Sequence, residues 1–168
     1  METTGRFAPS PSGRLHLGNL LCALLVWLSA RQKGGRVLLR VEDLDTARCP
    51  RRYAAQMEAD LRWLGLDWDI GPGKDGGTGP YEQSRRTAVY QAALEKLQGM
   101  GRVYPCFCTR AELHASSAPH LEDGQVIYAG TCRHLTAAEI AEKSSLRPPA
   151  LRLAVPDERW GFTDGHMG

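Results

Sequence analysis

The segment from Arg6 to Asn19 constrains the fold of this 168-residue chain more than any other part of it. It reads R-F-A-P-S-P-S-G-R-L-H-L-G-N, a bend of proline, serine and glycine that leads into an apolar run with helical spacing. His16 and Gly18 should therefore lie at a helix start, where free backbone N–H groups and the helix macrodipole favour an anion. Glycine at position 18 would let a ligand approach the backbone closely, so a nucleotide is the obvious candidate. The run that predicts the helix consists of Leu20, Leu21, Leu24, Leu25 and Leu28.

The residues around this segment are typical of half a doubly wound, Rossmann-type α/β fold with a parallel sheet. The pattern predicts a strand over 6–8, a helix over 19–33 closed by two glycines, and a second strand over 36–41. In such folds ligands bind beyond the carboxyl ends of the strands, which is where Ser10, His16 and Glu42 would converge.

A second helix and a glycine-rich loop follow, and both are expected to be structural. An apolar face over 50–64 predicts the helix, which ends at Gly65. Residues 71–80 contain five glycines and two prolines and match neither a P-loop nor a G-x-G-x-x-G motif, so they predict a flexible loop. Ser84 is placed to cap a third helix, and Asp43 is interpreted as a helix-start or loop-fixing group.

Five cysteines, including the pair Cys106 and Cys108, favour metal binding in a reducing compartment over a disulfide framework. Two thiolates separated by one residue can bind the same ion at a turn, and Cys132 can supply a third sulfur. A structural zinc site needs a fourth ligand, for which His134 is one candidate because imidazole is a common zinc ligand. Cysteines buried without a metal are the alternative, and Cys22 in the first helix is expected to pack in the core.

The residues that flank these cysteines predict two further helices and a strand. Thr109 with Glu112, and Thr136 with Glu139, have the spacing of a capping box, so each pair predicts a helix start. Residues 147–156 read as an extended return strand.

Composition sets the class of protein but not its function. With 42% apolar and 24% charged residues, the chain has the make-up of an ordinary soluble globular protein. Its net charge of +2 is too small to predict nucleic-acid binding, which would need a local basic patch. The apolar run over 15–30 is too short and too polar to cross a membrane, and no signal peptide precedes it. We therefore expect a cytoplasmic protein that does not bind membranes.

Two blocks of sequence carry a resemblance to a known family. The motif P-S-P-S-G-x-L-H-x-G, followed by R-V-E-D-L-D over 40–45, resembles the class I glutamyl-tRNA synthetase family, whose HIGH signature corresponds to residues 16–19. The resemblance runs from Arg6 to the C-terminus. Within the family, the likeness is closest to the glutamyl-queuosine tRNA(Asp) synthetase branch, whose members are shortened and have no anticodon-binding domain.

The resemblance implies a ligase that activates glutamate with ATP and Mg²⁺ and transfers it to queuosine in tRNA(Asp), acting as a monomer. The implied catalytic residues are His16, Gly18 and Asn19, which together with Pro9 would also bind ATP. The implied glutamate-binding residues are Arg6, Ser10 and Glu42.

The resemblance also implies the composition of the metal site. It nominates Tyr128, in the sequence I-Y-A-G-T-C-R, as the fourth ligand of a structural Zn²⁺ beside Cys106, Cys108 and Cys132. The phenol would have to be deprotonated by the metal.

The implied domain organisation places the first half of the Rossmann-type catalytic domain at 1–101, a zinc-binding insertion near the tRNA acceptor end at 102–146, and a return strand and turn at 147–168. Because no K-M-S-K-S-like signature follows, we expect the chain to be truncated and inactive alone. Two alternatives are a fragment of an ordinary glutamyl-tRNA synthetase and a non-catalytic, zinc-stabilised module that binds tRNA or a protein.

Overall fold

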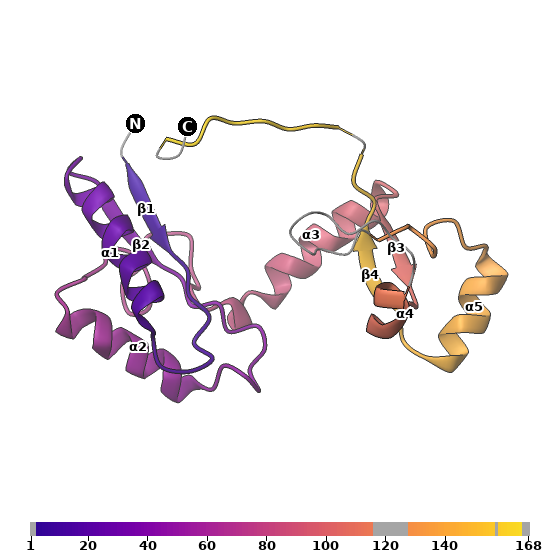
Figure 1. Cartoon of the computed structure of the whole chain (residues 1–168), viewed down its shortest axis with the longest axis horizontal. Coiled ribbons are helices and arrows are strands. Elements are labelled where there is room, and N and C mark those ends of the chain that lie inside the picture. The colour runs from indigo at the N-terminus through magenta and orange to yellow at the C-terminus, as the bar shows by residue number, and fades with distance from the viewer. Residues whose placement is uncertain (1–2, 116–127, 157, 166–168) are drawn as a thin grey trace. The chain divides into compact units, whose positions relative to one another are not determined.

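The structure is a computed structural model that describes residues 3–115, 128–156 and 158–165. The chain forms two compact units, Met1–Gln91 and Ala92–Gly168, which divide within helix α3 (Thr87–Gly99) (Figure 1). None of the helices in the described ranges is long and apolar enough to cross a bilayer.

The first unit is built on a parallel β-α-β arrangement. Strand β1 (Thr4–Phe7) pairs in parallel with β2 (Arg36–Leu39), and helix α1 (Leu17–Arg31) connects them and packs against both (Figure 1). The register joins Thr4 to Arg36, Gly5 to Val37, Arg6 to Leu38 and Phe7 to Leu39. On the other side of β2, Ile70 forms a parallel bridge with Leu38. The predicted α/β fold with parallel strands is therefore confirmed for this unit.

Helix α1 contacts the sheet through small side chains rather than through its leucines. Ala23 and Ala30 are buried, and a side chain at Gly5 of β1 would meet Val26 at 3.0 Å, so helix and strand approach closely. The face that carries most of the predicted leucine run is exposed: Leu21, Leu24, Leu25 and Leu28 are 39–56% accessible. Cys22 is also exposed, so the prediction that it packs in the core is wrong. The residues of α1 that contact the sheet and the core are Ala23, Val26, Trp27 and Ala30 instead.

The core of the unit combines buried residues of α1, of β2 and of helix α2 (Arg51–Trp63). Met57 and Leu61, on the predicted apolar face of α2, are almost fully buried, which confirms the second helix. The core residues are Ala23, Ala30, Val37, Leu39, Val41, Met57, Leu61 and Trp68.

A polar clamp ties the C-terminal turn of α1 to the chain beyond α2. Arg31 donates to Asp67 Oδ1 over 3.0 Å and to Asp69 Oδ2 over 2.7 Å, while the indole N–H of Trp27 donates to Asp67 Oδ1 over 2.9 Å. Asp69 Oδ2 also accepts the Val37 backbone N–H over 2.7 Å. One guanidinium thus joins a helix, a strand and a loop.

Ser84 belongs to a short 3-10 helix, η1 (Gln83–Arg85), and does not cap α3. Its backbone N–H and its hydroxyl donate to the two carboxylate oxygens of Asp43, over 2.9 Å and 2.7 Å. The predicted cap is therefore wrong, because the hydroxyl satisfies a carboxylate 41 residues away. The loop-fixing interpretation of Asp43 is confirmed.

The second unit contains an antiparallel hairpin and two short helices. Strand β3 (Val103–Cys106) pairs with β4 (Ala150–Leu153), which confirms the expected return strand. Helices α4 (Arg110–Ala115) and α5 (Ala137–Leu146) begin after the predicted capping residues. Its core is built from Cys106, Phe107 and Cys132, with Tyr104, Cys108, Tyr128, Leu135 and Ile140 packed against them.

Both capping boxes form as predicted. The Glu112 backbone N–H donates to Thr109 Oγ1 over 3.1 Å, and the Glu112 carboxylate accepts the Thr109 N–H over 2.6 Å. Thr136 and Glu139 repeat the arrangement with distances of 3.3 Å and 2.7 Å.

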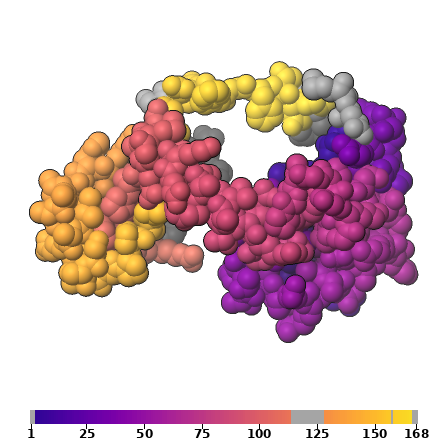
Figure 2. Space-filling model, turned by 180° about the vertical axis from the view of Figure 1, so that it is seen from behind, coloured from indigo at the N-terminus to yellow at the C-terminus, as the bar shows by residue number. Residues whose placement is uncertain are grey.

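After β4, residues 154–156 and 158–165 form neither helix nor strand. In the space-filling view these residues make a narrow run of atoms rather than a packed layer (Figure 2). The predicted turn over 162–168 ends at positions that lie outside the described residues.

Candidate functional sites

The start of helix α1 has the features that the sequence predicts for an anion site. His16 is the N-cap residue, and its carbonyl oxygen accepts the N–H groups of Asn19 and Leu20 over 3.0 Å and 3.2 Å. The Asn19 side chain accepts the His16 backbone N–H over 3.3 Å. The N–H groups of Leu17 and Gly18 belong to the first turn, where backbone donors have no acceptor within the helix. Free N–H groups of this kind bind anions at helix N-termini in other proteins.

Glycine at position 18 leaves room for the imidazole of His16. A Cβ atom placed on Gly18 would lie 3.1 Å from His16 Cε1 and 3.2 Å from His16 Nδ1. These distances are tighter than ordinary van der Waals contact, so any side chain at position 18 would displace the ring. The predicted role of Gly18, space for a ligand, stays a prediction; the structure shows that the absence of a side chain at position 18 leaves room for the His16 ring.

Ser10 and Glu42 lie three residues beyond the carboxyl ends of β1 and β2, and they line one pocket of about 370 Å³. The Glu42 backbone N–H donates to the Pro9 carbonyl over 2.9 Å, which holds the two loops together. The Glu42 carboxylate pairs with Arg40. A serine and a carboxylate at the edge of a parallel sheet suit a small polar ligand.

The other predicted ATP- and glutamate-binding residues are not brought to that pocket. Arg6 is exposed on β1, and Pro9 is buried in the bend that follows. Arg6, His16, Gly18 and Asn19 are not among the residues that line the Ser10 and Glu42 pocket. Their roles in binding ATP and glutamate stay predictions.

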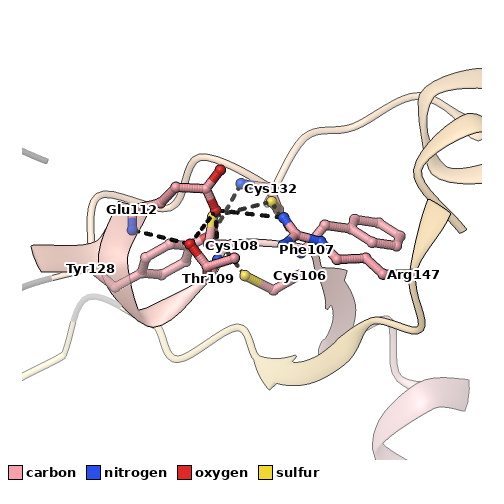
Figure 3. A network of polar contacts seen from close by, with 8 residues as sticks. All are labelled: Cys106, Phe107, Cys108, Thr109, Glu112, Tyr128, Cys132 and Arg147. Atoms are coloured by element: carbon pink, nitrogen blue, oxygen red, sulfur yellow. Dashed lines mark hydrogen bonds and ion pairs between the residues drawn. The ribbon is translucent and has the colours of Figure 1, made fainter. Parts of the chain in front are cut away.

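The predicted metal ligands of the second unit do converge. The Sγ atoms of Cys106, Cys108 and Cys132 lie within 4.8 Å of one another, although Cys132 is 24 residues from Cys108. Tyr128 Oη lies 3.3 Å from Cys106 Sγ and 3.8 Å from Cys108 Sγ. Figure 3 shows the four side chains directed toward a common centre at the end of β3.

Backbone donors complete this cluster. The Phe107 N–H points at Cys132 Sγ over 3.5 Å, and the Cys132 N–H donates to Tyr128 Oη over 3.0 Å. His134, the rival fourth ligand, is exposed and is not part of the cluster. The described geometry favours Tyr128.

Residues 2–168 match the family model described as tRNA synthetases class I (E and Q), catalytic domain. The chain belongs to this family. The resemblance drawn from the motifs around His16 and Glu42 is thereby confirmed.

Curated relatives of the chain carry two kinds of name. The glutamyl-Q tRNA(Asp) synthetase of Symbiobacterium thermophilum is 56% identical over 163 residues, which cover 95% of this chain and 50% of that protein. The enzyme of the same name from Nitratidesulfovibrio vulgaris is 52% identical over 98% of this chain and 51% of its own length. A glutamate–tRNA ligase 2 from Alkalilimnicola ehrlichii is 50% identical over 91% of this chain and 32% of its own length. The chain thus spans about half the length of the glutamyl-Q tRNA(Asp) synthetases that it matches.

The fold agrees with solved members of the family. The crystal structure of a glutamate tRNA ligase from Elizabethkingia meningosepticum, in complex with its amino acid, superposes with a TM-score of 0.73 at 32% identity. The match covers 95% of this chain and 34% of that chain. The class I synthetase fold is therefore shown for nearly the whole length.

The cysteine cluster of this synthetase chain fits a tetrahedral zinc ion. With Zn–S bonds near 2.3 Å, neighbouring sulfurs of a tetrahedral site lie about 3.8 Å apart, and an oxygen ligand lies about 3.5 Å from each sulfur. The distance between Cys108 Sγ and Cys132 Sγ is 3.6 Å, and the two Tyr128 distances are 3.3 Å and 3.8 Å. These three distances fit tetrahedral zinc coordination.

The surroundings of the cluster shift the pKa values of Cys106 and Cys108 in opposite directions. Burial raises the pKa of Cys106, but hydrogen bonds from Tyr128, from the Cys108 backbone N–H and from Arg152 outweigh it, and the pKa falls to about 6. Burial raises the pKa of Cys108 to about 11, and Cys132 adds to the rise. Burial also raises the pKa of Tyr128 above its ordinary value, so a phenolate here requires a cation beside it.

Arg152 is the contact that the sequence did not predict. It lies on β4, far from the Cys-x-Cys pair in sequence, and no motif marks it. It reaches the cluster through the β3–β4 register, which places it opposite Tyr104 and diagonal to Cys106.

Proposed function

We propose that this chain supplies the N-terminal part of a glutamyl-queuosine tRNA(Asp) synthetase. The proposed reaction is ATP-dependent activation of glutamate to glutamyl-adenylate, followed by transfer to queuosine in tRNA(Asp). The observation that carries the proposal is the 56% identity, over 95% of the chain, to a relative named glutamyl-Q tRNA(Asp) synthetase.

The chemistry of adenylate formation assigns roles to the residues of the first unit. A glutamate carboxylate oxygen attacks the α-phosphate of ATP in line, and pyrophosphate leaves. The enzyme must hold both reactants and stabilise charge on the phosphoryl oxygens. In the proposal, Mg²⁺ and the N–H groups at the start of α1 bind the phosphates together with His16 and Asn19. Pro9 and Gly18 shape the nucleotide site.

The glutamate side of the site uses three residues in the proposal. Arg6 binds a carboxylate with its planar guanidinium, Ser10 donates a hydrogen bond, and Glu42 binds the α-ammonium group. The pocket that Ser10 and Glu42 share supports the last two roles. Binding of the ammonium group would replace the present Arg40 contact of Glu42.

In the second unit we propose that Cys106, Cys108, Cys132 and Tyr128 bind a structural Zn²⁺. Three sulfurs and one oxygen fill a tetrahedron and leave no open position for a reacting group. The zinc therefore fixes the fold of an insertion that contacts the tRNA acceptor end. It takes no part in the chemical step.

A chimera tests the function. The matched segment of the Symbiobacterium thermophilum relative is replaced by this chain, and glutamate-dependent exchange of pyrophosphate into ATP is measured. We expect exchange by the chimera and none by the chain alone. Exchange that does not depend on glutamate, or a folded chimera without any exchange, would refute the proposal.

The same chimera also shows which of two tRNAs, tRNA(Asp) or tRNA(Glu), accepts the glutamate. We expect radiolabelled glutamate to enter queuosine-containing tRNA(Asp) and not tRNA(Glu). The 50% identity to a glutamate–tRNA ligase 2 favours the second candidate, an ordinary glutamyl-tRNA synthetase. The other half of the chimera also contributes to the choice of tRNA. A second chimera is therefore assayed beside the first, in which this chain is joined to the remainder of the Alkalilimnicola ehrlichii ligase. Labelling of tRNA(Glu) by both chimeras would favour the ordinary synthetase.

A further inference from the structure

Arg152 lies on the same face of the β3–β4 hairpin as the first cysteine of the cluster. In the antiparallel register Cys106 is opposite Ala150 and Tyr104 is opposite Arg152. Residues two apart on a strand share a face, so Cys106 and Arg152 are diagonal neighbours on it. The hairpin thereby directs a guanidinium toward the thiol end of β3.

The side chain of Arg152 contacts two of the four candidate ligands. Its guanidinium carbon lies 4.0 Å from the centre of the Tyr128 ring. It also lies close enough to Cys106 to help lower the pKa of that thiol. The Nε atom of Arg152 is buried and has no hydrogen-bond partner among the described residues.

A zinc ion with three thiolates and a phenolate carries a net negative charge, and uncompensated charge in a protein interior is costly. Arginine stays protonated at every physiological pH, and its flat guanidinium can stack on an aromatic ring while it donates to a sulfur. Arg152 combines these two contacts at one site.

We propose that Arg152 is a positioning residue of the zinc site. Its guanidinium holds the Tyr128 ring and the Cys106 thiolate in the geometry of metal ligands, and it offsets part of the negative charge of the loaded cluster. This inference rests on the zinc site proposed above.

The test compares zinc affinities of the whole chain by competition with a chromophoric chelator. The variants are Arg152→Met, which keeps the bulk and removes the charge, and Arg152→Lys, which keeps the charge and removes the flat guanidinium. Arg147→Met is the matched control, because Arg147 is a guanidinium of the same unit that pairs with Glu112 at 3.5 Å instead of with a cysteine (Figure 3). A second readout is the visible spectrum of the Co²⁺-substituted protein, which reports the geometry of the ligands.

We expect Arg152→Met to weaken zinc binding about 10–100-fold, the usual effect of losing a group that orients metal ligands. Arg152→Lys should recover part of this loss, Arg147→Met should bind zinc as the parent does, and the cobalt spectrum should change only in the two Arg152 variants. If Arg152→Met does not fold, Arg152→Lys with a weaker affinity and an altered cobalt spectrum gives the same support.

Three results would overturn the inference. Parent affinity and an unchanged cobalt spectrum in the folded Arg152 variants would show that the residue does not position the ligands. An equal loss in Arg147→Met would show a general effect of charge. A parent protein that binds neither zinc nor cobalt would overturn the zinc site itself and the inference with it.

Discussion

The candidate site of the second unit is assembled, whereas that of the first unit is only partly assembled. The sulfurs of Cys106, Cys108 and Cys132 lie within 4.8 Å of one another, and Tyr128 Oη lies 3.3 Å from Cys106 Sγ and 3.8 Å from Cys108 Sγ. In the first unit Ser10 and Glu42 share a pocket that His16 does not line. Each site was predicted from sequence, so the difference lies in how the fold builds them.

A metal cluster can be closed by a hairpin and one loop, because four side chains need only meet at a point. A nucleotide site at the edge of a parallel sheet takes its groups from separate loops and a helix start, and their geometry depends on how those elements meet. The chain spans about half the length of its glutamyl-Q relatives. The two sites should therefore respond differently to mutation: the metal site through stability, the other through ligand binding.

The largest effect is expected from Cys106→Ser, which removes one proposed zinc ligand. The variant should lose its metal, and the free energy of unfolding of the second unit should fall by about 3–5 kcal/mol. Zinc content and thermal unfolding measure the two effects together. Cys22→Ser is the matched control, because Cys22 is exposed in the first unit and should alter neither. A Cys106→Ser protein that is free of zinc and as stable as the parent would contradict the proposed structural role of the metal.

The next effect concerns Glu42 and is measured in the chimera. Glu42→Gln removes the carboxylate proposed to bind the α-ammonium group, so kcat/KM for glutamate in pyrophosphate exchange should fall roughly 30–150-fold, or about 2–3 kcal/mol. Glu82→Gln is the control, since Glu82 pairs with Arg85 and does not line the Ser10 pocket. Equal losses in the two variants would deny Glu42 a specific role.

Gly18→Ala tests the helix start. The added methyl group must displace the His16 imidazole, so the KM for ATP in the chimera should rise about tenfold, or about 1.4 kcal/mol. The free energy of unfolding should hold or improve slightly, since alanine is a better helix former by up to about 1 kcal/mol. Gly13→Ala is the control, because a Cβ there meets nothing within 4 Å. A Gly18→Ala chimera with the parent KM for ATP would show that Gly18 does not affect nucleotide binding.

The smallest effect is expected from Asp69→Asn in the polar clamp. Burial raises the pKa of Asp69, but hydrogen bonds from the Val37 N–H and from Arg31 outweigh it and hold the pKa below its usual range. The ionised carboxylate therefore stabilises the fold above its unfolded pKa near 3.9, and this contribution is lost as the pH falls through the lower folded pKa. Because the side chain is about one-third exposed, the loss in the variant should be only about 1 kcal/mol at pH 7.

Urea unfolding followed by tryptophan fluorescence checks this prediction at pH 7 and again at pH 2.5. The difference between parent and Asp69→Asn should shrink at the lower pH, because the carboxylate is protonated increasingly as the pH falls. Glu58→Gln is the control, because its ion pair with Arg62 joins residues i and i+4 of one helix and such pairs contribute only about 0.2–0.5 kcal/mol. A difference that persists in full at low pH would assign the effect to something other than ionisation.

The sequence predicted what depends on near neighbours. The capping boxes at Thr109 and Thr136 formed because both partners lie three residues apart. Helix α1 was predicted because its apolar spacing is local. The sequence could not tell which face of α1 packs on the sheet, because that depends on contact with Gly5 of the neighbouring strand β1.

Interactions between distant segments were the ones that the sequence missed. Serine is a common helix N-cap residue, but the Ser84 hydroxyl donates to Asp43, 41 residues away, and does not cap α3. Arg152 reaches the cysteine cluster only because β3 and β4 pair in one register. The cysteine cluster was predictable in spite of its long loop because few residue types ligate zinc and their spacing is distinctive.

X-ray absorption spectroscopy of the zinc-loaded chain tests the contrast between the two units most directly, because it counts the ligands that the second unit supplies without any partner. The account predicts one zinc per chain, with three sulfurs at about 2.3 Å and one oxygen near 2.0 Å, and loss of the oxygen signal in Tyr128→Phe. A shell that contains nitrogen, or one that is unchanged in Tyr128→Phe, would contradict the assembled site.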